Sequence, residues 1–167
     1  MMMSQWHDFL IMVGGAAAAL TGLVFVAMSL NLEVIARDAT HRHRAIGTLT
    51  GFTAAFMICA LALMGDQNEQ AAGVEWLVIS GVAAGIYIHG YVQAIKIGKS
   101  SIGLSNNRLA VGTSLYIIEI IGAVMLALGH ISGLYIASVA LIALIVFTIT
   151  GAWLLVIGVY EARTRQK

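Results

Sequence analysis

The chain of 167 residues has no proline, a single cysteine and few charged side chains. Charged residues make up 10% of it, against about 25% in typical soluble domains, while hydrophobic residues make up 60%. So few charges cannot cover a soluble surface, which excludes an ordinary soluble domain. The cysteine, Cys59, lies inside an apolar run without a partner for an intrachain disulfide, so we interpret it as a small core residue.

Conventional catalytic motifs are also missing from the chain. There is no G-x-S-x-G segment, no H-E-x-x-H segment, no P-loop and no cysteine pair for redox chemistry. These absences favour a protein that is not an enzyme and holds no cofactor, with an intramembrane enzyme built on isolated residues as the alternative. We expect the lipid bilayer to be the main partner and expect no nucleic acid.

What the chain has instead is five long apolar runs separated by short polar breaks. Each run must be helical, because lipid offers the backbone no hydrogen-bond partners. A helix needs about 20 apolar residues to cross a bilayer, and every run is long enough. The sequence therefore predicts an all-α, polytopic transmembrane helical bundle that forms one domain over residues 1–167. The predicted helices cover about 9–32, 45–65, 76–95, 109–128 and 133–158.

The break between the fourth and fifth runs is only residues 129–133, and two of these are glycines. Such a short break predicts a tight antiparallel hairpin. A single helix of 52 residues is the alternative, and it would not fit a bilayer.

Lysine and arginine fall on one side of the predicted topology. The breaks on the opposite side hold acidic residues and no basic one. The positive-inside rule then places the N-terminus outside and the C-terminus in the cytoplasm, and we expect a bacterial inner membrane. The nine basic residues follow the first, third and fifth runs: Arg37, Arg42, Arg44, Lys96, Lys99, Arg108, Arg163, Arg165 and Lys167.

One acidic residue, Glu119, lies at the midpoint of the fourth run. An ionisable group at that depth costs about 2.5–3.5 kcal/mol on insertion scales, so it should find a protein partner or water. His89 is the partner we expect, with Tyr116 between them and Gln93 farther along the same helix face as His89. Two interpretations stay open: a hydrogen-bonded pair that fixes helix packing, or a pathway that handles protons or ions.

Small residues form stripes on three of the predicted helices. Gly15 and Gly22 share one face of the first, while the second and third carry G-x-x-x-G spacings. Such spacings let helix backbones approach closely, either within one subunit or between subunits. The glycines of the two spacings are Gly47, Gly51, Gly81 and Gly85.

The segment 33–44 contains Asp38, His41 and His43, which are possible metal ligands. Interleaved arginines would repel a cation, and no second cluster completes a site. We therefore expect no metal and favour a basic loop lying against anionic lipid head groups.

The residues Trp6-His7-Asp8-Phe9, followed by Gly14 to Leu23 and then Ser29 to Leu32, resemble the opening of a group of small bacterial membrane proteins. Some members carry a label as modulators of a membrane-bound AAA protease. The resemblance covers about the first fifth of the chain by motif and the rest by hydropathy. It implies a bacterial inner-membrane location and assigns no functional residue.

Two functional hypotheses follow from the sequence. In the first, the protein is a homo-oligomeric channel or transporter for an ion or small solute, because five helices barely enclose a hydrated path. Glu119 would then set the ion preference and His89 would tune it with pH. In the second, the protein is an accessory or regulatory subunit that packs against another membrane protein, such as a membrane protease.

Overall fold

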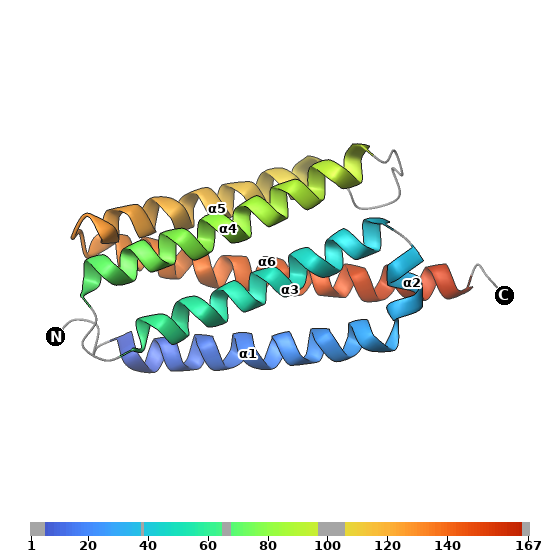
Figure 1. The fold of residues 1–167 in the computed structure, drawn as a ribbon, viewed down its shortest axis with the longest axis horizontal. Coiled ribbons are helices and arrows are strands. Elements are labelled where there is room, and N and C mark those ends of the chain that lie inside the picture. The colour runs from blue at the N-terminus through green and yellow to red at the C-terminus, as the bar shows by residue number, and fades with distance from the viewer. Residues whose placement is uncertain (1–5, 38, 65–67, 97–105, 165–167) are drawn as a thin grey trace.

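The computed structural model describes residues 6–37, 39–64, 68–96 and 106–164, which form helices and no strand (Figure 1). A short helix, α2 (Leu32–Arg37), joins the first two of five long helices. The expected all-α fold is therefore confirmed for the described residues. The long helices are α1 (His7–Leu30), α3 (Ala39–Ala62), α4 (Glu69–Lys96), α5 (Asn106–Ala127) and α6 (Ser132–Thr164).

Each of the five long helices contains a stretch that is long and apolar enough to cross a membrane. Their outer surfaces are apolar as well: Leu23 is 66% exposed, Phe25 61% and Val139 67%. A soluble protein rarely exposes so much contiguous apolar surface, whereas lipid tolerates it. The fold is thus compatible with a multi-pass integral membrane protein. The stretches are His7–Leu30, His41–Ala62, Glu69–Gln93, Asn107–Ala127 and Ser132–Ile157.

Several helices extend beyond the apolar runs from which they were predicted. Helix α4 begins at Glu69 rather than at residue 76, and α3 begins at Ala39 rather than at residue 45. Helix α6 continues to Thr164, so its 33 residues rise about 50 Å, against a hydrocarbon thickness of about 30 Å. Such a length is compatible with polar first and last turns that extend past the hydrocarbon of a bilayer.

The segment after α1 differs from the expected basic loop. Residues Leu32–Arg37 form α2, and His41 and His43 belong to α3. Ile35 of α2 is 5% exposed and packs in a small cluster with Ala45 and Leu155, so apolar contact with α3 and α6 holds this segment against the bundle. Asp38 lies outside the described residues.

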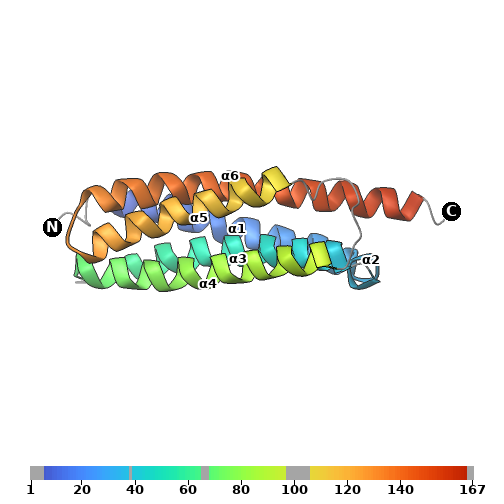
Figure 2. The same cartoon turned by 90° about the horizontal axis from the view of Figure 1, so that it is seen from above.

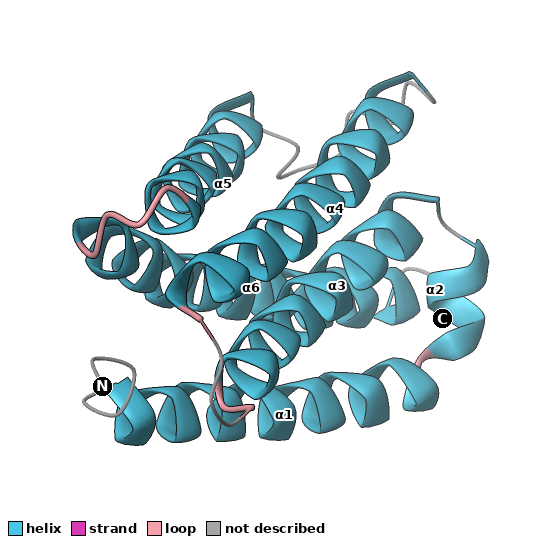
Figure 3. Ribbon diagram, turned by 60° about the vertical axis from the view of Figure 1, so that its left-hand side comes forward, coloured by secondary structure: helices cyan, strands magenta, loops and turns pink. Residues whose placement is uncertain are grey.

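Helix α3 lies at the centre of the bundle and packs against α1, α4 and α6 (Figure 3). Helix α5 packs against α4 and α6, which closes the other side of the bundle (Figure 2). Helix α1 begins at one end and α6 finishes at the other, as an odd number of spans requires (Figure 1). We call the end that holds α2, the start of α3 and the start of α5 the basic end, because the arginines and lysines of the described residues lie there: Arg37, Arg42, Arg44, Lys96, Arg108 and Arg163.

The predicted hairpin between α5 and α6 is present. Gly129 has a φ of 84°, the left-handed conformation that favours glycine. The amide of Gly129 donates to the carbonyl of Leu126, and that of His130 donates to the carbonyl of Met125. This pair of hydrogen bonds is the Schellman arrangement, which ends α5 and reverses the chain within four residues.

Candidate functional site

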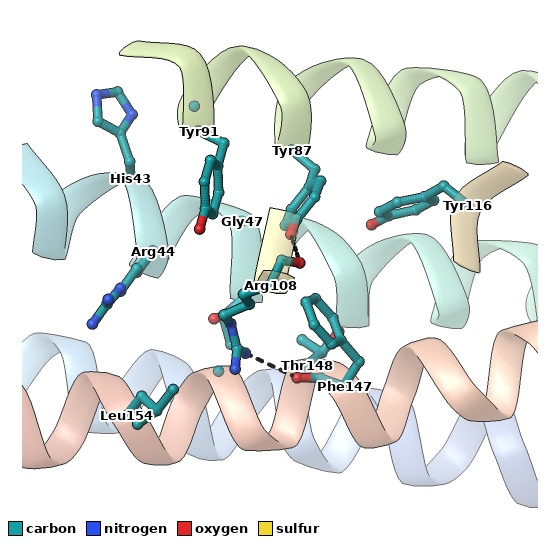
Figure 4. A pocket seen from close by; sticks show the side chains of 13 residues that line it. His43, Arg44, Gly47, Tyr87, Tyr91, Arg108, Tyr116, Phe147, Thr148 and Leu154 are labelled. Atoms are coloured by element: carbon teal, nitrogen blue, oxygen red, sulfur yellow. Dashed lines mark hydrogen bonds between the residues drawn. The ribbon is translucent and has the colours of Figure 1, made fainter. Parts of the chain in front are cut away.

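A pocket lies between α3, α4, α5 and α6 in the half of the bundle nearest the basic end (Figure 4). It encloses about 720 Å³ of space, including the part that is open to the outside. His43 and Arg44 are half-buried at its basic end, while Tyr116 at its other end is 6% exposed. The pocket thus opens toward the basic end and closes near the middle of α5. Its lining consists of His43, Arg44, Gly47, Thr48, Tyr87, Gly90, Tyr91, Arg108, Tyr116, Phe147, Thr148, Gly151 and Leu154.

Arg108, in the first turn of α5, crosses the pocket to α6. Its Nη2 donates to the carbonyl oxygen of Phe147 at 3.2 Å and to the hydroxyl of Thr150 at 3.4 Å. The guanidinium carbon lies 4.5 Å from the centre of the Phe147 ring, a stacked cation–π arrangement. These contacts fix the guanidinium group through one nitrogen. Within the described chain, no hydrogen bond engages its Nε or Nη1.

A second arginine reaches the pocket from α3. Arg44 is half-buried, and its charge and that of Arg108 both act on the side chain of Tyr91. Figure 4 shows Tyr91 pointing from α4 into the pocket, and His43 lying beside α4 at its edge. No acidic residue is among the described residues that line the pocket. Its lining is therefore positively charged, which favours an anionic ligand.

The deep wall of the pocket is aromatic. The ring centre of Tyr87 lies 5.7 Å from that of Tyr116 and 6.1 Å from that of Phe147. The Tyr87 hydroxyl donates to the backbone carbonyl of Arg108 at 3.0 Å, which ties α4 to the first turn of α5. The pocket thus combines cationic groups near its opening with an apolar, aromatic floor.

Glycines make room for these side chains. A Cβ atom at Gly151 would lie 2.8 Å from Nη2 of Arg108, and one at Gly90 would lie 3.6 Å from Nδ1 of His43. The absence of a side chain at Gly151 lets Arg108 lie against α6, whereas the distance at Gly90 is an ordinary van der Waals contact.

Glu119 lies in the closed half of the bundle, beyond the pocket floor. Its side chain is 1% exposed, and its Oε1 accepts a hydrogen bond of 3.1 Å from the indole Nε1 of Trp76 on α4. The hydroxyl of Ser80, one turn from Trp76, lies near the same carboxyl group but makes no hydrogen bond within the described structure. The sequence predicts that Glu119 has a protein partner at this depth, and the partner in the structure is the indole of Trp76.

The structure does not bring His89 to Glu119. His89 is exposed on α4, 13 residues beyond Trp76, which corresponds to about 20 Å along the helix. The expected pairing of His89 with Glu119 depends on the relative register of α4 and α5. The sequence of one helix does not define that register. Tyr116 is buried in the pocket floor, and Gln93 is half-buried near the end of the membrane-spanning part of α4.

The predicted packing glycines divide into two groups. Gly47 and Gly51 face the interior: a Cβ atom at Gly51 would lie 3.0 Å from the hydroxyl oxygen of Thr148. The other four are exposed, and a Cβ atom on any of them would have no neighbour within 4 Å; these are Gly15, Gly22, Gly81 and Gly85.

The tightest helix contacts lie at glycines that the sequence analysis missed. A Cβ atom at Gly122 would lie 2.5 Å from the backbone nitrogen of Ala137, and one at Gly73 would meet the backbone of Leu126 and Ala127. Neither glycine belongs to a predicted G-x-x-x-G spacing: Gly73 meets the backbone of α5, and Gly122 lies against a second glycine, Gly133, on α6.

In the sequence, the two arginines of the pocket, Arg44 and Arg108, indicate only the topology. Arg44 and Arg108 each stand immediately before an apolar run, so their long side chains can turn back into the bundle. Tyr87 and Tyr91 are four residues apart on one helix face, which was the other available signal. Among the described residues, no three His, Cys, Asp or Glu side chains lie close enough together to hold a metal ion.

No protein-family model, curated protein or solved structure matches this chain. The chemistry of the pocket and of the Glu119 site therefore supports the functional argument on its own.

Proposed function

We propose that the protein is a membrane transporter that binds a small anionic solute in the pocket at its basic end. The observation that carries the proposal is the convergence of Arg44 and Arg108, from two different helices, on one pocket whose described lining has no acidic residue. Guanidinium groups bind carboxylates and phosphates through paired hydrogen bonds, and a partly dry pocket strengthens the attraction.

The shape of the pocket supports transport by alternating access. The pocket opens toward the basic end and stops at Tyr116, the eleventh of the 22 residues of α5. Beyond it, Trp76, Ala123 and Leu126 pack in the main apolar core, each at most 2% exposed. A site that is open on one side and closed at mid-depth suits a transporter better than a continuous pore. With the basic end in the cytoplasm, the solute enters from that side.

Binding is tested on purified protein in a mild detergent at low, matched ionic strength. Sodium phosphate and sodium benzoate should each raise the midpoint of thermal unfolding, whereas choline chloride should not, because ligands stabilise the state that binds them. Arg108→Gln should abolish the rise. Arg42→Gln is the matched control, since Arg42 is exposed on α3 and does not line the pocket. An equal rise in both variants would overturn the proposal.

Transport is tested in liposomes that contain the purified protein. Labelled phosphate or benzoate should accumulate faster than in empty liposomes, and Arg108→Gln should reduce the initial rate at least tenfold. Binding without uptake would leave a receptor for the anion and would contradict the transport step.

A homo-oligomeric channel is the second candidate, and the exposed glycines favour it. Gly81 and Gly85 leave a strip of bare backbone on the outer surface of α4, where a second copy can approach closely. Cross-linking in lipid should then give a defined oligomer that Gly85→Leu breaks and that Ile86→Leu, also exposed on α4, leaves intact. A monomer throughout would contradict this candidate. Co-purification of a different membrane protein at fixed stoichiometry would favour the accessory role that the N-terminal resemblance implies.

A further inference from the structure

The buried carboxyl group of Glu119 has no positive partner among the described residues. Its side chain is 1% exposed, and its hydrogen bond comes from the neutral indole of Trp76. The nearest basic residue on the same helix is Arg108, 11 residues or about 16 Å along α5. A carboxylate buried without a positive partner is so costly that such a group binds a proton instead.

The helices around Glu119 bring only weak acids toward it. Helix α5 packs against α4 and α6, and neither residues 76–86 of α4 nor residues 136–159 of α6 include an ionisable side chain. Its charge acts on Tyr116, one turn earlier on α5, and on the thiol of Cys59 on α3. Phenols and thiols are ordinarily neutral at neutral pH, so a proton exchanged in this region belongs to Glu119.

Ser80 offers the carboxyl group a partner in either protonation state. Its hydroxyl is buried near that group and makes no hydrogen bond within the described structure. By contrast, the helical hydroxyls of Thr21, Ser29 and Thr148 each donate to the backbone carbonyl one turn earlier. A hydroxyl accepts from a neutral acid and donates to a carboxylate, so Ser80 suits a proton that is bound and released.

The pocket approaches Glu119 from one side. Tyr116, which lines the pocket floor, stands one turn before Glu119 on α5. On the other side, Trp76, Ala123 and Leu126 belong to the main apolar core. Among the described residues, the pocket is therefore the opening from which a proton has the shortest way to the carboxyl group.

We infer that Glu119, with Ser80 as its partner, is a proton-binding site that couples proton movement to transport of the anion. The inference rests on the proposed function and adds a coupling ion to it. On binding, an O–H bond forms at the carboxylate as a hydronium ion from the solution gives up its proton and becomes water. An anion at Arg108 and an ionised Glu119 repel each other across about 16 Å, which at an effective dielectric constant of about 20 corresponds to about fivefold in affinity. The proton should therefore strengthen anion binding about fivefold, and the anion should strengthen proton binding equally.

Infrared spectroscopy of the purified full chain in lipid tests the proton site without any anion. The unmodified protein should show the carbonyl band of a protonated carboxylic acid at neutral pH, and raising the pH should remove the band. Glu119→Gln should lack it, whereas Glu33→Gln, at an exposed position on α2, should keep it. Ser80→Ala should shift the band to higher frequency, because the acid loses the hydroxyl to which it donates.

The shift in Ser80→Ala also assigns the band if Glu119→Gln does not fold. Absence of the band, a band that does not shift in Ser80→Ala, or a band that persists at every pH at which the protein stays folded would overturn the inference. The last of these outcomes is the one expected of an acid that only holds helices together.

Titration with benzoate, a carboxylate that stays charged above about pH 6, tests the coupling. From about pH 6 to about pH 9, the affinity should fall about fivefold more in the unmodified protein than in Glu119→Gln. His43 at the pocket opening titrates in both proteins, so the difference between them isolates Glu119. An equal pH dependence in both would overturn the inference and leave the proposed anion site standing. Failure of benzoate to bind to either protein would remove the proposed function and the coupling with it.

Uptake into liposomes tests whether the proton moves with the anion. Labelled phosphate should enter faster when the outside is more acidic than the inside, and a protonophore that collapses the gradient should remove the gain. Glu119→Gln should show no gain, whereas Glu33→Gln should behave like the unmodified protein. An equal gain in Glu119→Gln would overturn the inference.

Discussion

At the scale of single residues, the hydrogen bond from Trp76 to Glu119 should be the interaction most sensitive to mutation. Both side chains are at most 2% exposed, so neither has water to turn to if the other is removed. A buried polar group that loses its partner costs about 1–3 kcal/mol. This bond also ties α4 to α5 in the half of the bundle that the pocket does not reach.

Trp76→Phe should therefore lower the free energy of unfolding by about 1–3 kcal/mol, since the ring still packs but the indole donor is gone. Glu119→Gln should cost less, because its amide oxygen still accepts from Trp76. Trp153→Phe is the control, with a side chain that is 65% exposed. The measurement is the denaturant midpoint in detergent, and equal losses in Trp76→Phe and Trp153→Phe would contradict the expected importance of the bond.

The sequence predicts the burial of Glu119 but not its partner. Its central position in an apolar run is enough to require a protein neighbour. Which neighbour it meets depends on how far α4 slides along α5, and that register is decided by single close contacts such as Gly73 against Leu126. Trp76 stands at the start of an apolar run, a position that suits an aromatic residue of the membrane interface equally well, so the sequence does not mark it as the partner.

At the scale of helices, glycines that meet the backbone of the neighbouring helix make the closest contacts. Gly122 faces the backbone of Ala137 across the α5–α6 hairpin, whereas Gly85 faces no atom within 4 Å of where its Cβ would be. The G-x-x-x-G spacings therefore did not predict where the chain packs most tightly. Hydrophobic length predicted all five of the long apolar helices, because that requirement acts on each helix separately.

Gly122→Ala should destabilise the protein by about 1–3 kcal/mol, because its methyl group would lie 2.5 Å from the backbone nitrogen of Ala137 and the helices must separate. Gly85→Ala should change the stability of the monomer little or raise it slightly, since alanine is the better helix former. Thermal unfolding of both variants in detergent makes the comparison. A Gly85→Ala variant as unstable as Gly122→Ala would show that α4 is covered on that face.

At the scale of the whole molecule, the two ends differ in charge, and the pocket opens at the basic one. In the proposed function, the direction in which the solute enters depends on which end faces the cytoplasm. The single cysteine, Cys59, is 0% exposed, so the chain offers a nearly silent background for labelling introduced cysteines.

His130→Cys in the α5–α6 turn and Arg42→Cys at the basic end should react on opposite sides of the membrane. Both native positions are exposed, so each introduced thiol should be accessible to a membrane-impermeant maleimide. In intact cells His130→Cys should label first, and Arg42→Cys only after the membrane is opened. The unmodified chain is the control. Labelling of both positions from one side would contradict the predicted threading.

The four-residue reversal at Gly129 also has a consequence for how the protein is made. Only four residues separate α5 from α6, so we expect the two segments to reach the translocon in close succession and to enter the lipid as a pair. Helix α5, which carries Glu119, would then be covered during synthesis by α4, which is already in place, and by α6. A nascent chain arrested just after the turn should be retained by the translocon or degraded, whereas one arrested after α6 should enter the bilayer.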